Sequence, residues 1–316
     1  MQDSHERSGE AGGDDDLERS AALLAAELPS ARYHDPRYLR WLYDENPLGP
    51  AVRGSLDDST GRLAHYALVP QEWAGAAGLL RLAISLNAVV ASRAQRGGRF
   101  TALARDLFAR APQQGIVGTL TVANANSTPA FLRRLGLRMV RPLSVTAIPA
   151  FPHRAQVHST PIDPGTLAGP RIVALAEEIA AVPVARLAQR WTVAQLRWRL
   201  ANPIARYVLH ESEDLLAIST VERAFGIRAA VLLKLWPRAG RSAVSARPIV
   251  AAACRHHRAP YSVHAGFNAH VRMPGVAVPR RLLPSPLNLL AGAFDASVEI
   301  DALVPDTYEF FDADHY

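Results

Sequence analysis

A turn rich in glycine and arginine, Gln95-Arg96-Gly97-Gly98-Arg99-Phe100, separates a Val-rich segment from an amphipathic one. Adjacent glycines can adopt positive φ and let the backbone approach a ligand closely. Consecutive N–H groups at a helix start, together with the positive end of the helix dipole, bind anions. The turn therefore predicts a phosphate or diphosphate site, with a plain connector and solvated arginines as the alternative. Its spacing matches neither G-x-x-x-x-G-K-[ST] nor G-x-G-x-x-G.

The segments around this turn have the apolar spacing of regular secondary structure. Strands are predicted at 51–57, 61–70, 78–92, 115–122 and 138–150. Helices are predicted at 17–30, 35–47, 100–111 and 127–136. In the second of these helices Asp35 is expected to cap and Pro36 to occupy the first turn. Strands mixed with crossover helices predict an α/β fold in which the glycine turn joins a strand to a helix.

Two short sequence motifs recur along the chain, each at almost the same offset. Leu39-Arg40-Trp41 recurs at Leu196-Arg197-Trp198, an offset of 157, and Asn46-Pro47 recurs at Asn202-Pro203, an offset of 156. Each copy lies in a predicted helix that breaks into a strand, which indicates a duplicated domain. The later half continues with strands at 214–223, 227–236 and 260–267 and a helix at 245–258. It contains no glycine turn between strand and helix, so any phosphate site belongs to the first half.

The expected division of the chain follows from these patterns. A disordered acidic tail is expected at 1–17, because this segment is rich in Gly, Asp and Ser. The first domain is expected at 18–152, a linker rich in Pro, His and Gly at 153–168, and the second domain at 169–316. A chain of 316 residues suits two domains of ordinary size.

Composition limits the class of protein. The chain is 49% hydrophobic and 20% charged, which is typical of a globular protein, and no apolar run approaches the ~18 residues of a membrane span. The net charge is +6, but residues 1–18 carry −6, so the remainder carries +12. No zinc spacing, recognition helix or aromatic-interleaved basic ribbon indicates nucleic-acid binding, so a small polyphosphate ligand is preferred. A single cysteine, Cys254, excludes an internal disulfide and suits a reducing compartment, and we expect the cytoplasm.

The wider context of the turn resembles the coenzyme A signature of the GNAT acyltransferase superfamily. Gln95 and Gly98 occupy the two defining places of its Gln-x-x-Gly-x-(Gly/Ala) motif, after a Val-rich strand and before a helix. A second segment, "VANANSTPAFLRRLGLR", resembles the family's N-x-x-S/A…L-Y-x-K-L-G-F pattern, with matches at Asn124, Ser127, Leu135 and Gly136. Phe100 departs from the pattern, because a small residue is usual there. The resemblance covers residues 30–150 and extends to the rest only through the duplication, as in two-lobed members.

The resemblance implies two GNAT-like lobes, each a mixed, mostly antiparallel sheet flanked by helices. The first sheet would splay between its fourth and fifth strands, at about 82–92 and 116–123. Acetyl-CoA or another acyl-CoA would be the cosubstrate, with its pantetheine arm added to the splayed edge and its pyrophosphate on the turn. The implied coenzyme-binding residues are Ala88, Val89, Val90, Gln95, Arg96, Gly97, Gly98, Arg99, Phe100, Thr101, Asn124 and Ser127.

Catalytic groups are harder to assign. Residues 78–92 contain no Asp or Glu, and Leu132 occupies the place of the family's frequent tyrosine, so the acid and base must lie elsewhere or be water. Weak candidates are Glu72, Asp301 and Tyr308, each with a surface or structural role as the alternative. His264 and His270 lie six residues apart, but no third ligand spacing supports a metal site, and none is expected.

The predicted activity is N-acyl transfer to a small-molecule amine by direct attack in a ternary complex, in a monomer or homodimer. A non-catalytic acyl-CoA-binding or regulatory protein is the alternative, because an obvious acid and base are missing. A Fem-type transferase that uses aminoacyl-tRNA fits two lobes and a basic body, but those proteins generally lack the glycine turn.

Overall fold

The computed structural model describes residues 7–9, 13–28, 30–76, 78–95, 98–224 and 226–313. The chain forms two compact units. The first unit comprises Met1–Trp73, Leu79–Val140 and Asn288–Leu303, and the second comprises Ala74–Gly78, Arg141–Leu287 and Val304–Tyr316. No helix among the described residues is long and apolar enough to cross a membrane.

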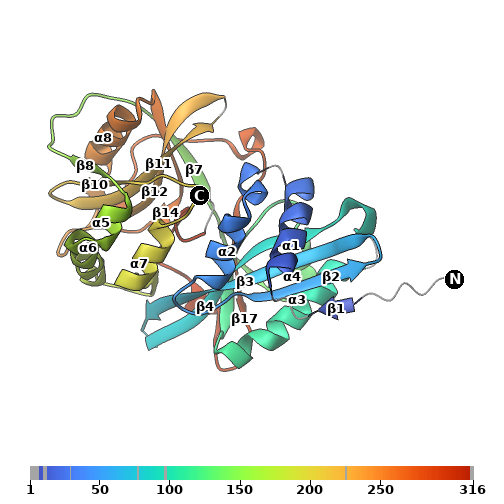
Figure 1. Ribbon diagram of the computed structural model, residues 1–316. Helices are drawn as coiled ribbons and strands as arrows, with labels where there is room; N and C mark the ends of the chain where they lie inside the picture. The colour runs from blue at the N-terminus through green and yellow to red at the C-terminus, as the bar shows by residue number, and fades with distance from the viewer. Residues whose placement is uncertain are drawn as a thin grey trace. The chain divides into compact units, whose positions relative to one another are not determined.

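The sheet of the first unit has the order β1-β2-β3-β4-β5-β17-β6 (Figure 1). Its strands are β1 (Arg7–Gly9), β2 (Val52–Asp58), β3 (Gly61–Gly75), β4 (Gly78–Val90), β5 (Gly118–Ala123), β17 (Asn288–Ala293) and β6 (Arg138–Pro142). β4 and β5 run parallel, as a crossover helix between them requires, whereas β2 and β3 form an antiparallel hairpin and β17 is antiparallel to β5. β9 (Leu187–Gln189) is a further short strand and belongs to the second unit.

Helices cover both faces of this sheet (Figure 1). They are α1 (Asp14–Glu27), α2 (Pro36–Asp44), α3 (Arg99–Arg110) and α4 (Thr128–Arg134), with short 3₁₀ turns at Ala31–His34, Ser92–Ala94 and Ala111–Gln114. Successive side chains of β3 point to opposite faces of the sheet, as in any β-strand. His65 contacts Tyr43 of α2, whereas Tyr66 contacts Phe100 of α3. The α1–α2 face and the α3–α4 face of β3 and β4 are therefore distinct surroundings.

The sheet of the second unit has the order β16-β7-β14-β12-β11-β10-β8, and β18 also pairs with β14. Its strands are β7 (Ser144–Pro149), β8 (His158–Pro161), β10 (Val208–Glu211), β11 (Leu215–Ala224), β12 (Ile227–Pro237), β14 (Tyr261–Asn268), β16 (Val276–Ala277) and β18 (Thr307–Glu309). Its helices are α5 (Pro164–Ala168), α6 (Pro170–Ala180), α7 (Val193–Leu200) and α8 (Arg247–His257), and a small pair is formed by β13 (Val244–Ser245) and β15 (Val271–Arg272). Further 3₁₀ turns lie at Arg280–Leu282 and, in the first unit, at Ile300–Leu303.

The second sheet is buried on both faces. Val231 and Leu233 of β12 pack with residues of α6 and α7 in one core, whereas Ala230 and Leu232 pack with residues of α8 in the other. Continuous apolar runs such as Ala229–Leu233 thus reflect a strand with helices on both sides, for which strict polar alternation is not needed. The four predicted elements of this half, at 214–223, 227–236, 245–258 and 260–267, correspond to β11, β12, α8 and β14.

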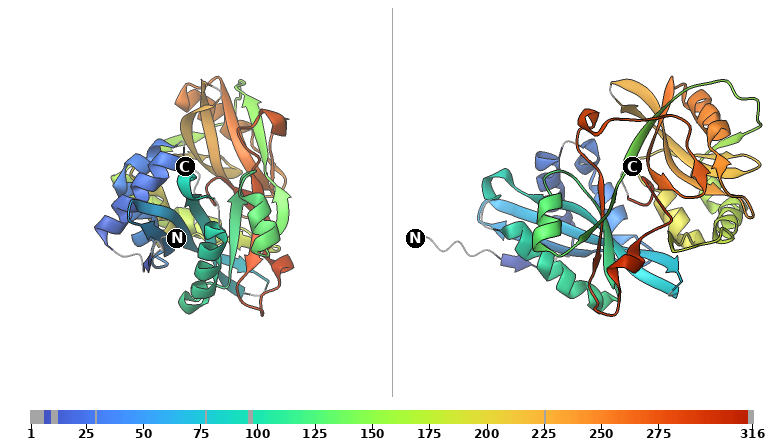
Figure 2. Two further views of the ribbon diagram at one scale, coloured as in Figure 1. Left: turned by 90° about the vertical axis from the view of Figure 1, so that its right-hand side faces the viewer. Right: turned by 180° about the vertical axis from the view of Figure 1, so that it is seen from behind.

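The two sheets have one topology. β2-β3-β4-β5-β17-β6 matches β10-β11-β12-β14-β7-β16 strand for strand, which confirms the predicted duplication. The marker asparagines also match: Asn46 and Asn202 are both buried, and each accepts a hydrogen bond from the backbone N–H two residues later, at Leu48 and Ile204. One feature departs from simple tandem copies. β7 enters the second sheet, and the strand beside β5 is β17, from near the end of the chain (Figure 2).

Several expected boundaries differ from the structure. α1 begins at Asp14, inside the expected tail 1–17, because three acidic residues lie in its first turn, where they suit the helix dipole. The expected linker 153–168 contains β8, which pairs with β10, and α5. The expected strand 138–150 is two strands, β6 and β7, in different sheets. The second domain is interrupted, since Asn288–Leu303 belongs to the first unit.

Candidate functional site

β4 and β5 separate along their length, as the resemblance to the GNAT superfamily implied. Their parallel pairing extends only from Leu82 opposite Gly118 to Ile84 opposite Leu120. The hydroxyl of Thr121 then donates to the carbonyl oxygen of Ser85 at 3.2 Å. Within the described ranges, no strand pairs with residues 86–90 of β4 on the β5 side. This half of β4 is an edge whose backbone groups can accept an extended ligand.

β4 is irregular at Asn87, which has a φ of 55°. Ala83 packs in the core on the α3–α4 face, and the hydroxyl of Ser85 contacts Tyr66 on that face. Ala88 and Val90 also pack against this core. The β4 residues that point toward α3 and α4 therefore have odd numbers before Asn87 and even numbers after it. Such a shift by one residue indicates a β-bulge.

The sequence reasoning missed Asn87, although a signal was present. Asparagine is among the few residues other than glycine that adopt the left-handed conformation readily, and here it interrupts an apolar strand. A bulge leaves a residue outside the regular ladder, so it can turn a backbone N–H away from β3. Ala88 and Val90 lie half-buried beyond the bulge and Val89 is buried, so the predicted pantetheine edge and the bulge are continuous.

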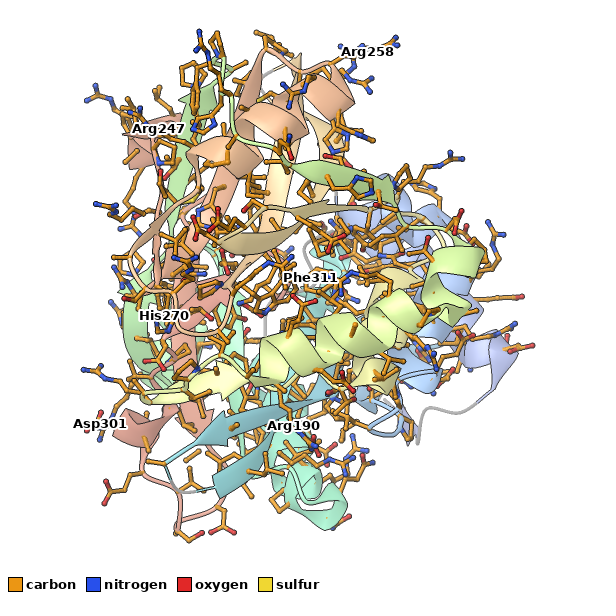
Figure 3. The ribbon with its side chains drawn as sticks, turned by 90° about the vertical axis from the view of Figure 1, so that its left-hand side faces the viewer. Arg190, Arg247, Arg258, His270, Asp301 and Phe311 are labelled. Atoms are coloured by element: carbon orange, nitrogen blue, oxygen red, sulfur yellow. The ribbon has the colours of Figure 1, made fainter. Side chains whose placement is uncertain are left out.

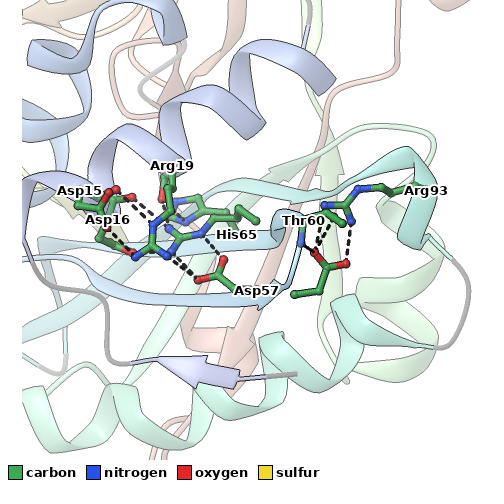
Figure 4. Close-up of polar contacts among 10 residues, drawn as sticks. Asp15, Asp16, Arg19, Asp57, Thr60, His65 and Arg93 are labelled. Atoms are coloured by element: carbon green, nitrogen blue, oxygen red, sulfur yellow. Dashed lines mark hydrogen bonds and ion pairs between the residues drawn. The ribbon is translucent and has the colours of Figure 1, made fainter. Parts of the chain in front are cut away.

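The beginning of the glycine turn is fixed by polar contacts on two sides. Ser92 donates from its backbone N–H and its hydroxyl to Glu27 of α1, at 2.8 and 2.6 Å. The hydrogen bonds from Ser92 lower the pKa of Glu27 and hold it ionised. Arg93 forms an ion pair with Asp58 at the tip of the β2–β3 hairpin, at 3.1 Å (Figure 4). The turn therefore starts from a defined position.

The end of the turn has the geometry that the sequence predicted. Gly98 has a φ of 74° and is the N-cap of α3, and among the described residues no side-chain hydrogen bond caps this helix. No heavy atom lies within 4 Å of a Cβ built at Gly98, so the glycine is required by its backbone conformation and not by crowding. The first N–H groups of α3 have no partner within the helix. Gln95 is exposed, and the predicted residues Arg96 and Gly97 lie outside the described residues.

The three residues that open α3 have different surroundings. The Arg99 guanidinium donates to the carbonyl oxygen of Ala94 at 3.3 Å and so bridges the turn. The Phe100 ring packs edge-on against Phe131 at 5.5 Å and lies 5.8 Å from Tyr66. This explains the departure from the family pattern at Phe100, because the ring fills the core and only the backbone faces the turn. Thr101 is buried.

Asn124 and Ser127 form a closed loop after β5. The Asn124 Oδ1 accepts from the backbone N–H and hydroxyl of Ser127, at 2.9 and 3.1 Å, and from the Asn126 N–H at 3.0 Å. Both side chains therefore shape the turn into α4. Their predicted contacts to the coenzyme remain predictions.

The three candidate catalytic residues have different surroundings. Glu72 is half-buried in β3 of the first unit. Asp301 is exposed and lies 3.6 Å from Arg138, and it projects outward in Figure 3. Tyr308 belongs to the second unit and is fully buried, which raises its pKa well above the usual value. Its burial argues against direct contact with a substrate.

The corresponding splay of the second unit is filled by the chain itself. β12 and β14 pair in parallel only from Ala229 opposite Tyr261 to Leu232 opposite His264. β18 then lies antiparallel to the next part of β14, with Gly266 opposite Glu309. Leu233 of β12 accepts a hydrogen bond from the Phe311 N–H at 3.0 Å, so the segment bridges both strands. Phe311 lies among the interior side chains in Figure 3.

A buried charged cluster holds this segment. Lys234 donates to Asp312 at 2.6 Å and to the hydroxyl of Thr307 at 3.1 Å, and its ammonium lies 3.2 Å from Glu309. His264 is 2.9 Å from Glu309 and lies in β14, which corresponds to the predicted strand 260–267. Burial disfavours the charged form of Glu309, but Lys234 and His264 lower its pKa overall. Within the described ranges, no group of three or more His, Cys, Asp or Glu side chains could hold a metal ion.

No protein-family model matches this sequence, and no curated protein matches it. Solved structures do match its fold. A GCN5-related N-acetyltransferase from Anabaena variabilis is 13% identical, with a TM-score of 0.61 over 92% of this chain and 73% of that one. The chain has the GNAT fold. A probable N-acyltransferase from Enterococcus faecalis is 11% identical, with a TM-score of 0.59 over 91% and 72% of the two chains. Saccharomyces cerevisiae N-myristoyltransferase, solved with myristoyl-CoA, is 8% identical, with a TM-score of 0.58 over 92% and 83%. At these identities the similarity concerns the GNAT fold, which agrees with the splayed sheet and the duplicated lobes.

Proposed function

We propose that the protein transfers an acetyl or other short acyl group from acyl-CoA to the amine of a small molecule, and that the first unit binds the coenzyme. The observation that carries this proposal is the joint arrangement in one unit of the splayed β4 edge, the bulge at Asn87 and the uncapped start of α3. The edge would take the pantetheine arm as an added strand, and the N–H groups at the helix start would hold the pyrophosphate.

The chemistry proposed for this site is direct attack. The neutral amine nitrogen forms a bond to the thioester carbon, the carbon–sulfur bond breaks, the nitrogen loses a proton to give the amide, and the thiolate takes up a proton. A backbone N–H of the Asn87–Ala88 bulge would stabilise the negative charge that develops on the carbonyl oxygen. β4 carries no carboxylate, so we propose that water takes the proton from the nitrogen and delivers one to the thiolate.

The coenzyme site is tested at Gly98. In Gly98→Val a β-branched residue must occupy a left-handed conformation, which costs L-residues about 1–2 kcal/mol or more. We therefore expect the Kd for acetyl-CoA to rise about tenfold or more, measured by isothermal titration calorimetry. The matched control is Gly240→Val, because Gly240 has a φ of 75°, also has open surroundings, and lies in the second unit.

The same titration gives the stoichiometry. One coenzyme per chain is expected, because β18 fills the splay of the second unit. A wild-type protein that binds neither acetyl-CoA nor CoA would contradict the proposed function. Equal weakening by Gly98→Val and Gly240→Val would show that the glycine turn is not the pyrophosphate site.

One observation favours a second function, acyl-CoA binding without turnover. Leu132, at the place of the family's frequent tyrosine, packs against the core of the first unit, so it offers no proton to the thiolate. Release of free thiol from acetyl-CoA with a panel of amines distinguishes the two functions. Binding without release would favour a regulatory protein.

We also propose a cytoplasmic location, because the single cysteine, Cys254, is a buried free thiol.

A further inference from the structure

The side chain of Asn87 is held from both ends by tyrosines. The Tyr33 hydroxyl donates to Asn87 Oδ1 at 2.7 Å, and Asn87 Nδ2 donates to the Tyr43 hydroxyl at 2.6 Å. Tyr33 is 8% exposed and Tyr43 is fully buried. These contacts lie on the α1–α2 face, opposite the face on which Ala88 and Val90 pack.

The contacts continue inward through a buried histidine. The Tyr43 hydroxyl lies 3.0 Å from His65 Nε2, and His65 Nδ1 lies 3.2 Å from the Ser20 hydroxyl. Arg62 Nη1 donates to the same Ser20 oxygen at 2.5 Å. The chain of contacts therefore runs from the bulge in β4, through α2 and β3, to α1.

Fixed donors lie at the two ends of this chain of contacts. The amide of Asn87 and the guanidinium of Arg62 can only donate. The hydroxyls of Tyr43 and Ser20 each have two acceptor sites, so the ring of His65 accepts from one hydroxyl and donates to the other, with its proton on either nitrogen. This arrangement needs a neutral imidazole. Burial, together with the charges of Arg62 and Arg53, lowers the pKa of His65 to about 3 and supplies that neutral form.

The inner end of the chain is rigid because Arg62 is an ion-paired, buried side chain. Its guanidinium lies 2.7 Å from Asp16 of α1 and 2.9 Å from Asp57 of β2 (Figure 4). The Arg62 side chain is 3% exposed and that of Asp16 is 7% exposed. Buried charges with several partners have few alternative arrangements, so Ser20 and His65 are held in one geometry.

We propose that Tyr33 and Tyr43 are positioning residues that lock Asn87 in its left-handed conformation, and so aim the bulge N–H at the thioester carbonyl of a bound acyl-CoA. This inference rests on the proposed function. A left-handed residue within a strand persists only when its surroundings over-determine it. Tyr33 and Tyr43 meet that requirement, because they form hydrogen bonds with both ends of the Asn87 amide and Tyr43 is itself held by the buried contacts described above.

The inference distinguishes acetyl-CoA from CoA. Both ligands have the pantetheine arm and the pyrophosphate, but only acetyl-CoA has a carbonyl for the bulge to contact. Loss of the tyrosine contacts should therefore weaken the carbonyl contact and leave CoA binding unchanged. A general loss of folding would instead weaken both ligands together.

The test uses Tyr43→Phe and Tyr33→Phe in the full chain. Each is expected to raise the Kd for acetyl-CoA about fivefold, the effect of one lost hydrogen bond, with the Kd for CoA unchanged. The carbonyl stretch of ¹³C-acetyl-CoA, lowered in frequency when bound to the wild type, should move back toward its value in solution. Tyr207→Phe is the control, because this buried tyrosine of the second unit also accepts from an asparagine, Asn202.

A further variant protects the test against misfolding of the tyrosine variants. Asn87→Gly tolerates a φ of 55° without strain but loses both side-chain contacts, so the bulge can form without being locked. It should give the same selective loss of the carbonyl contact. An unchanged ratio of the two Kd values, or an unshifted carbonyl frequency in the wild type, would overturn the positioning role while coenzyme binding stands. Absence of binding to either ligand would overturn the proposed function itself.

Discussion

The two units share one strand order but use the splay of their sheets in opposite ways. In the first unit, β4 separates from β5 after Ile84 and carries the bulge at Asn87. In the second unit, β12 separates from β14 after Leu232, and β18 occupies the gap. Parallel strands that diverge leave backbone groups in need of partners, and these can come from a ligand or from the chain. Among the described residues, the same geometry thus leaves an unpaired strand edge in the first unit, whereas in the second unit the chain's own strand β18 pairs there.

The glycine turn follows the same division. The connection from β4 to α3 contains Gly98 in a left-handed conformation at an uncapped helix start. The connection from β12 to α8 leads instead through β13, which pairs with β15. Duplication therefore preserved the scaffold, whereas the features that suit an anion occur in the first unit.

The largest effect is expected from disrupting the buried charged cluster that holds β18 in the second unit. Lys234→Met leaves Glu309 and Asp312 buried without their ammonium partner, which typically costs about 3–5 kcal/mol of stability. Urea unfolding monitored by tryptophan fluorescence measures this loss. The control is Arg241→Met, whose ion pair with Glu213 is exposed and is worth about 1 kcal/mol or less. Equal losses in the two variants would show that β18 is not held by this cluster.

An intermediate effect is expected from lowering the pH. It should reduce the stability of the second unit more than that of the first. Burial is the main cause that lowers the pKa of His65 and His210 to about 3 and of His257 to about 4. In the unfolded chain these groups take up protons below about pH 6.5, whereas the folded protein excludes them until pH 3–4. Their stabilising contribution is therefore complete above pH 6.5 and decreases as the pH falls, by about 1.4 kcal/mol per unit for each histidine.

The second unit contains two of these histidines, so it should lose protection first. Hydrogen-exchange mass spectrometry at pH 7 and pH 5, corrected for intrinsic exchange rates, separates the units. His210→Gln should reduce the pH dependence of the second unit, while the exposed His256→Gln should change it less. Equal or greater loss of protection in the first unit would contradict this expectation.

The smallest effect concerns the repeated helices α2 and α7. Asp35 caps α2 by accepting from the Arg37 N–H, and Thr192 caps α7 in a reciprocal pair with Gln195. Asp35→Ala and Thr192→Ala should each cost about 1 kcal/mol in urea unfolding, because each leaves a helix-start N–H without its partner. Glu213→Ala, on the exposed surface, is the control and should change stability by less than about 0.5 kcal/mol. A cap variant within the range of this control would show that the cap is dispensable.

The sequence by itself determined the local features. Asp35 and Pro36 set the start of α2, the apolar runs set β11 and β12, and Gly98 permitted a left-handed turn before α3. Each of these depends on residues a few positions apart, whose propensities and periods can be read directly. The resemblance of two short motifs then indicated the GNAT fold, which the comparison with solved structures supports.

Only the tertiary structure decided the features that depend on distant partners. The exchange of β7 and β17 between the sheets and the entry of β18 into the second splay have no local signal, because the strand pattern does not encode the neighbour with which a strand pairs. The side chain of Asn87, at the bulge, has hydrogen-bond partners in tyrosines 54 and 44 positions away. Burial of both sheet faces, and the need to satisfy buried polar groups, select these long-range pairings, and neither condition exists until the chain has folded.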